Sequence, residues 1–402
     1  MEPIKLYFDF RDIFRAPRLA LSGKKIWLFL LGNLAGFLLY WIFSYSALAL
    51  SGIAFNDAIQ SYGLYPCLFG VDAPWFAWGV YFFGSFGWIA FIHLSCAAVS
   101  RVTFKQLKGD NFFSASDAWD YVKKHWHPVI FTSIALILIL IFFLIFAGIF
   151  AFFGKIPFVG EYLFALPYLL YLMGAVFTIY TVFVLMVSCV YTPAIVGAYE
   201  EDTMGTVFQS YSIAWSQPWR VILYNALLFP LAVFSVRIFS WFLFAGFQLI
   251  NHVFSMDFLM GSKASSIVGN ALSYISPRGI CNSICTPFDS ACGTPCCFYT
   301  LPEAGALTGS ETGAAMILAL FFLILIFVII SYGLSILSVG ETLMFIIFKK
   351  KTDDDNVLER QDEDELDEEE NDDSFMETLS EENADDEASP EKDQDSTDSE
   401  EK

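Results

Sequence analysis

The chain has 402 residues, of which 56% are hydrophobic and 18% aromatic, while only 16% are charged. A water-soluble domain of this composition would expose large apolar patches, so the composition excludes an ordinary soluble protein and favours lipid as the solvent. The net charge of −21 combines two different parts. Residues 353–402 hold 26 acidic and 3 basic residues, a net charge of −23, whereas 17 acidic and 19 basic residues give the rest +2. We therefore expect a nearly neutral membrane body followed by a polyanionic tail.

Residues 1–25 predict a basic, amphipathic arm. Apolar and basic side chains interleave along it, a mixture suited to the headgroup layer, where basic residues meet anionic lipid. A signal peptide is the competing interpretation, because residues 47–49 (Ala-Leu-Ala) resemble a cleavage site. The preceding apolar run is much longer than the ~7 to 15 residues of a signal peptide, so an uncleaved first span is expected.

Residues 26–351 predict a membrane domain with six spans. Each apolar run reaches the ~20 residues that a hydrocarbon core of ~30 Å requires. Backbone groups in lipid must pair within their own segment, so each run is predicted to be a helix and the fold class is an all-α polytopic membrane bundle. The expected spans are residues 26–51, 73–99, 129–153, 163–190, 221–250 and 314–339.

Basic residues predict the orientation of the chain. The arm and the connection of residues 100–128 are rich in Lys and Arg, while residues 52–72 contain neither. The positive-inside rule therefore predicts that both termini are cytoplasmic. The connection near residue 200 is neutral evidence, because Glu200, Glu201 and Asp202 precede Arg220 and acidic residues count little in this rule.

A similar arrangement follows the second and the fourth span. In both places an amphipathic segment is followed by a Trp/Pro corner that leads into the next span, at Trp126 and Pro128 and again at Trp215 and Pro218. We expect two helical elbows that lie in the membrane interface.

This layout, and residues 193–220 above all, resembles a broad group of bacterial polytopic membrane proteins. The group includes the membrane domain attached to some glycerophosphoryl diester phosphodiesterases. The resemblance rests on Pro193 at the end of a span, the acidic turn at Glu200, an amphipathic stretch and the next membrane span. It covers about half of the chain. It implies a bacterial inner-membrane protein and lends no catalytic residues, since this chain lacks a soluble phosphodiesterase domain.

Six cysteines are expected on the extracytoplasmic side. Cys67 lies in the first outside loop, and five more lie in a Cys-rich outside loop at residues 251–313. Disulfides that staple this loop are the expected use in an oxidising compartment, although the sequence leaves the pairing open. A thiolate metal site is the alternative, but no C-x-x-C pair or nearby histidine completes a zinc pattern. The five loop cysteines are Cys281, Cys285, Cys292, Cys296 and Cys297.

Three ionisable residues at membrane depth are candidates for function, because a charge in lipid is costly. They are His93 in the second span, Arg237 in the fifth and Glu341 at the inner end of the sixth. Arg237 is the strongest candidate, and the alternative is that its side chain snorkels to the interface or pairs with a polar neighbour. His93 suits an interhelical hydrogen bond better than proton transfer.

Enzyme motifs are missing from the sequence. It contains no Walker A loop, no dinucleotide-binding glycine pattern, no nucleophile elbow and no H-E-x-x-H motif, so no catalytic residue, cofactor or metal is predicted. The polyanionic surface argues against a nucleic-acid partner.

Residues 352–402 are predicted to be a disordered, acidic, cytoplasmic tail, because self-repulsion and scarce apolar residues prevent a packed core. Its one apolar cluster, Phe375, Met376 and Leu379, is of the kind that folds onto a grooved partner protein. The alternative is that the tail is only an extended, hydrated chain that anionic lipid repels. The leading hypothesis is thus a non-enzymatic membrane-organising or interaction protein, and the second is a transporter or channel for a small solute, with Arg237 and His93 along its path.

Overall fold

The computed structural model describes residues 6–275 and 305–360, and within these ranges the chain forms helices and turns without a β-strand. The described residues up to Leu358 belong to one compact unit, and the second unit, residues 359–402, lies almost wholly outside the described ranges. The helices, in chain order, are η1 (Phe10–Arg15), α1 (Ala16–Ala20), α2 (Gly23–Leu50), α3 (Phe55–Tyr62), α4 (Trp75–Lys108), α5 (Ala115–Lys124), α6 (Trp126–Phe153), α7 (Val159–Ala165), α8 (Tyr168–Tyr199), α9 (Thr203–Ser216), α10 (Pro218–Phe254), α11 (Ser262–Ile275), α13 (Gly309–Thr352) and η2 (Val357–Glu359).

Six of the described helices are long and apolar enough to cross a membrane: α2, α4, α6, α8, α10 and α13. The predicted all-α fold with six spans is therefore confirmed, and the chain is an integral membrane protein. Three helices run well beyond their expected ends at residues 99, 190 and 339, since α4 continues to Lys108, α8 to Tyr199 and α13 to Thr352. The fourth span was predicted to begin at residue 163, but Pro167 separates the short α7 from α8, because proline lacks the N–H that a continuous helix needs.

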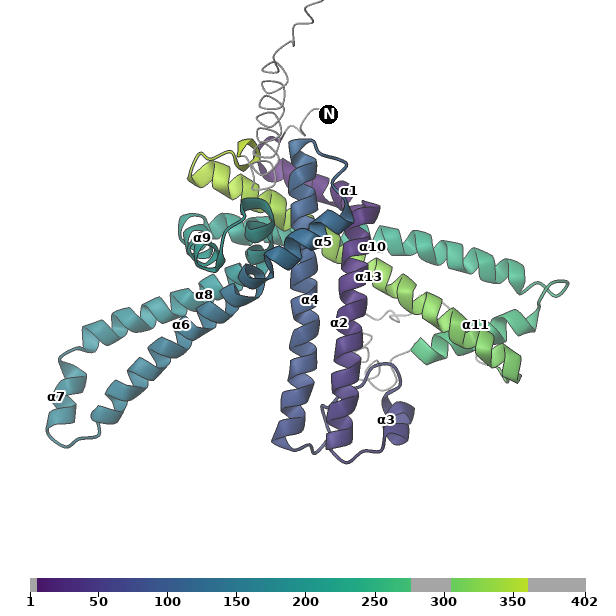
Figure 1. Ribbon diagram of the computed structural model, residues 1–402, viewed down its shortest axis with the longest axis horizontal. Helices are drawn as coiled ribbons and strands as arrows, with labels where there is room; N and C mark the ends of the chain where they lie inside the picture. The colour runs from purple at the N-terminus through teal and green to yellow at the C-terminus, as the bar shows by residue number, and fades with distance from the viewer. Residues whose placement is uncertain (1–5, 276–304, 361–402) are drawn as a thin grey trace, which may run out of the picture. The chain divides into compact units, whose positions relative to one another are not determined.

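The spanning helices pack in neighbouring pairs (Figure 1). Helix α2 runs along α4, α6 along α8, and α13 contacts α2, α4, α8, α10 and α11. Small residues allow the closest of these approaches: a side chain on Gly32 or Gly36 of α2 would collide with Ser95 or Trp88 of α4. The G-x-x-x-G spacing of α2 therefore serves packing within this chain.

Large apolar side chains cover the surface of the spanning helices. Only 6% of the most apolar part of α6 is buried within the protein, and residues such as Phe142, Leu144 and Phe152 are more than half exposed. In water this surface would cost a large free energy, whereas hydrocarbon solvates it at no such cost. These faces are therefore the lipid-facing surface of the protein.

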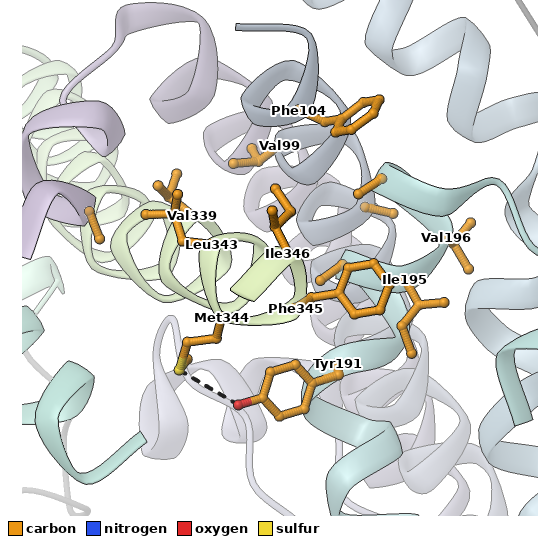
Figure 2. Close-up of a cluster of buried hydrophobic side chains, with 14 of the residues drawn as sticks. Val99, Phe104, Tyr191, Ile195, Val196, Val339, Leu343, Met344, Phe345 and Ile346 are labelled. Atoms are coloured by element: carbon orange, nitrogen blue, oxygen red, sulfur yellow. Dashed lines mark hydrogen bonds between the residues drawn. The ribbon is translucent and has the colours of Figure 1, made fainter. Parts of the chain in front are cut away.

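The largest buried cluster, here called the main core, joins the arm to one end of the bundle. It contains buried residues of η1 and α1, the second halves of α4, α8 and α13, and the first turns of α6 and α10. The stretch from Leu343 to Phe348 of α13 is apolar on all sides, so it must be enclosed by other helices. It is at most 1% exposed, with residues of α4 and α8 around it (Figure 2).

The two predicted elbows are helices that pack against the main core. Ser114 and Asp117 form a capping box at the start of α5, and the side chain of Asp202 accepts a hydrogen bond from the Gly205 amide (2.7 Å) at the start of α9. Helix α5 contacts α4, and α9 contacts α6 and α8. The predicted arm is likewise anchored, because Ile13 on η1 and Ala16 and Ala20 on α1 are fully buried.

Part of the predicted Cys-rich loop is helical. Helix α11 lies within residues 251–313 and packs along α13, where Ala271 and Ile275 form a small core with Ala315 and Ala319 of α13. Residues 276–304 lie outside the described ranges.

The crossing of α4 and α8 leads to a prediction. A Cβ atom on Gly197 would lie 2.7 Å from the backbone oxygen of Ala97 and 3.0 Å from the amide nitrogen of Arg101. Because backbone cannot move aside cheaply, we expect Gly197→Ala to destabilise the protein by about 1–3 kcal/mol in detergent unfolding. Gly174→Ala in the same helix is the control, since its Cβ would meet no atom within 4 Å. Equal effects of the two substitutions would contradict this packing.

Candidate functional site

A buried ion pair lies where α4 meets the end of α8. The Arg101 guanidinium is fully buried, and its Nη1 lies 2.7 Å from Oε1 of Glu200. Glu200 follows α8 in the left-handed conformation (φ 57°), which ends the helix and turns the carboxylate towards α4. The guanidinium also stacks on Tyr121 of α5, with 4.4 Å to the ring centroid, and the Tyr121 hydroxyl donates to the Val196 carbonyl (2.7 Å). This cluster joins α4, α5 and α8.

Hydroxyl groups join α13 to α4 one layer further along the core. The Thr342 hydroxyl donates to Ser100 Oγ (2.9 Å), and the Ser338 hydroxyl donates to the Cys96 carbonyl (3.0 Å). These side chains are buried and hydrogen-bonded, so the polar groups at this contact are satisfied without a water-filled path.

Glu341, a predicted candidate, lies in the same region. It is close enough to the Cys96 thiol and the Tyr191 hydroxyl to interact electrostatically with both. The Tyr191 hydroxyl accepts a hydrogen bond from Asn225 (2.7 Å) and donates one to Met344 Sδ (3.7 Å, Figure 2). Within residues 6–275 and 305–360, no side chain hydrogen-bonds to the Glu341 carboxyl group. Its neighbours Val339 and Leu343 in α13 belong to the main core.

His93 lies on the contact between α4 and α8. Its Nε2 is 3.2 Å from the Cys189 carbonyl oxygen of α8, and its Nδ1 is 3.1 Å from the Ile89 carbonyl oxygen in its own helix. Both ring nitrogens therefore contact backbone carbonyls, an arrangement typical of an interhelical hydrogen bond.

Arg237 lines a cavity of about 610 Å³ between α10, α11 and α13. Its neighbours there are almost all apolar, and they include Trp241, Phe244 and Phe247 of α10 and Phe322 of α13. His93 and Glu341 do not line this cavity, so the structure places the three predicted candidates at three separate sites.

A third polar region surrounds the end of α13, where the acidic tail begins. Its three lysines each pair with a carboxylate: Lys349 with Asp353 (2.7 Å), Lys350 with Asp354 (3.0 Å) and Lys351 with Asp9 of the arm (2.9 Å). The hydrogen bond and positive charge of Lys351 hold the pKa of Asp9 below its usual value. Gln217, just before α10, donates to the Phe348 carbonyl (3.2 Å) and to Thr352. We call this region the tail root; it links the arm, α10 and the last turn of α13.

Of the remaining predicted residues, only Cys67 lies within the described ranges. Cys67 carries a free thiol, and the five cysteines of the predicted stapled loop, Cys281 to Cys297, lie outside the described residues. Their disulfides stay a prediction. Phe375, Met376 and Leu379 also lie outside the described ranges. Among the residues that the structure does describe, no three His, Cys, Asp or Glu side chains are arranged to hold a metal ion.

No family model, curated protein or solved structure matches the chain. The class of the protein therefore rests on its fold: it is a polytopic, helical integral membrane protein. The resemblance to the phosphodiesterase-associated membrane domain stays a prediction.

The Arg101–Glu200 pair leads to a second prediction. Glu200→Gln leaves a fully buried guanidinium without its counter-charge, so we expect a loss of about 3–5 kcal/mol in unfolding free energy. Asp120→Asn is the control, because its pair with Lys123 is 65–72% exposed and should contribute less than about 1 kcal/mol. A loss below about 1 kcal/mol for Glu200→Gln, measured in the same detergent, would contradict the buried pair.

Proposed function

We propose that this chain is a non-enzymatic integral membrane protein that organises or binds partners at the cytoplasmic face of a bacterial inner membrane. Its termini are cytoplasmic, its basic arm and elbows lie against anionic lipid, and its acidic tail carries the partner motif. The distribution of Lys and Arg along the chain supports this orientation. The order of proline-containing helix, acidic turn, amphipathic helix and fresh span in α8–α10 supports kinship with the bacterial group described above.

The tail root is the observation that carries this proposal. The last turn of α13 leaves the main core and ends in three paired lysines, so the acidic segment starts from a fixed point beside the arm. A fixed starting point restricts the volume that a flexible tail searches and raises the effective concentration of its motif near the membrane. Free, unpaired lysines at a frayed helix end would not do this.

The closed polar contacts of the main core also support a non-enzymatic role. Arg101, Glu200, Ser100 and Thr342 all have partners within the protein, and they are used to hold helices together.

Within residues 6–275 and 305–360, one feature supports the transporter hypothesis, the cavity at Arg237. A transport path through both predicted residues would require His93 to face the same cavity, whereas His93 contacts the backbone of α8. Solute transport is therefore the second candidate function.

The proposal predicts which partners the tail recruits. We compare the full-length protein with a version that ends at Lys351 and with a Phe375→Ala, Met376→Ala, Leu379→Ala variant, using in-cell crosslinking and quantitative mass spectrometry. The shortened and the substituted protein both lack the three apolar anchors. Each should therefore recover the partners of the full-length protein in amounts that are lower by about tenfold or more.

A matched control uses polar residues of the same segment, Thr378→Ala with Ser380→Ala, which should keep the partners. If all four proteins recover the same partners in equal amounts, the tail does not recruit them and the proposal is wrong.

A further inference from the structure

The cavity between α10 and α13 has one polar end. Arg237 and Ser240 line that end, and Trp241, Phe244 and Phe247 follow along the same helix. The two helices run in opposite directions here, since Phe239 packs on Tyr332 (4.8 Å between ring centroids) and Phe247 on Phe322 (5.4 Å). The polar end of the cavity is therefore the end nearer the main core, which contains Tyr332.

The Arg237 guanidinium has no partner among the described residues. No hydrogen bond or ion pair joins it to residues 6–275 or 305–360, although it carries five N–H donors and a permanent charge. Its one polar neighbour in the cavity, Ser240, donates its hydroxyl hydrogen to the Val236 carbonyl (2.7 Å). Arginine within a spanning helix normally pairs with another group, because the unpaired charge is costly in lipid.

The guanidinium is open to the outside of the helix bundle. Arg237 itself is exposed, and so is Trp241, which lines the cavity one turn further along α10. An anionic group from the lipid phase can therefore reach the guanidinium.

We propose that this cavity binds an anionic glycerophospholipid, with its phosphodiester on Arg237 and an acyl chain along Phe244, Phe247 and Phe322. A guanidinium matches two phosphate oxygens with two parallel N–H donors. The apolar walls match the chain, and about 610 Å³ lies within the range of roughly 300–1,000 Å³ that ligand sites occupy. A small water-soluble anion would leave these aromatic walls without a partner.

Native mass spectrometry of the full-length protein tests the charge preference. The probes are phosphatidylglycerol and phosphatidylcholine with identical acyl chains, each titrated into the protein in mild detergent. We expect phosphatidylglycerol to bind at least about tenfold more tightly, and Arg237→Gln to abolish that preference while Arg237→Lys retains part of it. Arg220→Gln is the matched control, because Arg220 is an exposed arginine in the first turn of the same helix and does not line the cavity.

Photocrosslinking tests where on the protein the lipid binds. Phosphatidylglycerol with a diazirine on its acyl chain should label residues 240–247 and 322–329, and unlabelled phosphatidylglycerol should compete while phosphatidylcholine should not. The proposal is wrong if the two lipids bind alike, if Arg237→Gln keeps the preference, or if the label falls on helices other than α10, α11 and α13. The labelling and lipid-competition experiment uses the wild-type protein alone. It therefore decides the question even if Arg237→Gln fails to fold.

Discussion

The burial of the second half of α13 is the constraint on which the rest of the structure depends. From Leu343 to Phe348 this helix is apolar on every side, so it can be stable only inside a shell of other helices. Helices α4 and α8, the arm and the start of α10 supply that shell. Glycine and serine occur at the closest approaches between α4, α8 and α13, where small side chains let the helix backbones come near each other.

The polar groups of the main core follow from the same constraint. Enclosing α13 brings Arg101 and Glu200 away from water, and a buried charge is tolerated only beside its partner. The tail root extends the same principle to the surface, where lysines of α13 meet carboxylates of the arm and of the first tail residues. The spanning helices beyond the core need few such contacts, because lipid solvates their outer faces.

The sequence predicts the six spans and the two elbows because apolar length and amphipathic period are local properties. It does not predict the main core, since local patterns cannot reveal that α4 and α13 continue past the expected ends of their spans. Arg101 counted as one basic residue of a connection, and only the three-dimensional structure pairs it with Glu200. Arg237 could be singled out as a charge in an apolar span, but its cavity depends on α11 and on α13, and α13 lies far away in sequence.

The most direct test of the account is a crosslink at the tail root. Ser216 and Thr352 lie 3.5 Å apart between their hydroxyl oxygens, at the ends of α9 and α13. In isolated membranes treated with a copper–phenanthroline oxidant, a protein with Ser216→Cys and Thr352→Cys should form this disulfide rapidly, and mass spectrometry should recover the joined peptides. The pair Ser46→Cys with Thr352→Cys is the control, because Ser46 lies near the end of α2 that is remote from the main core. If the cysteines at positions 216 and 352 form a disulfide rapidly and the control pair does not, the result agrees with an enclosed α13. If neither pair forms a disulfide, or both pairs form one equally fast, the result contradicts the enclosure of α13.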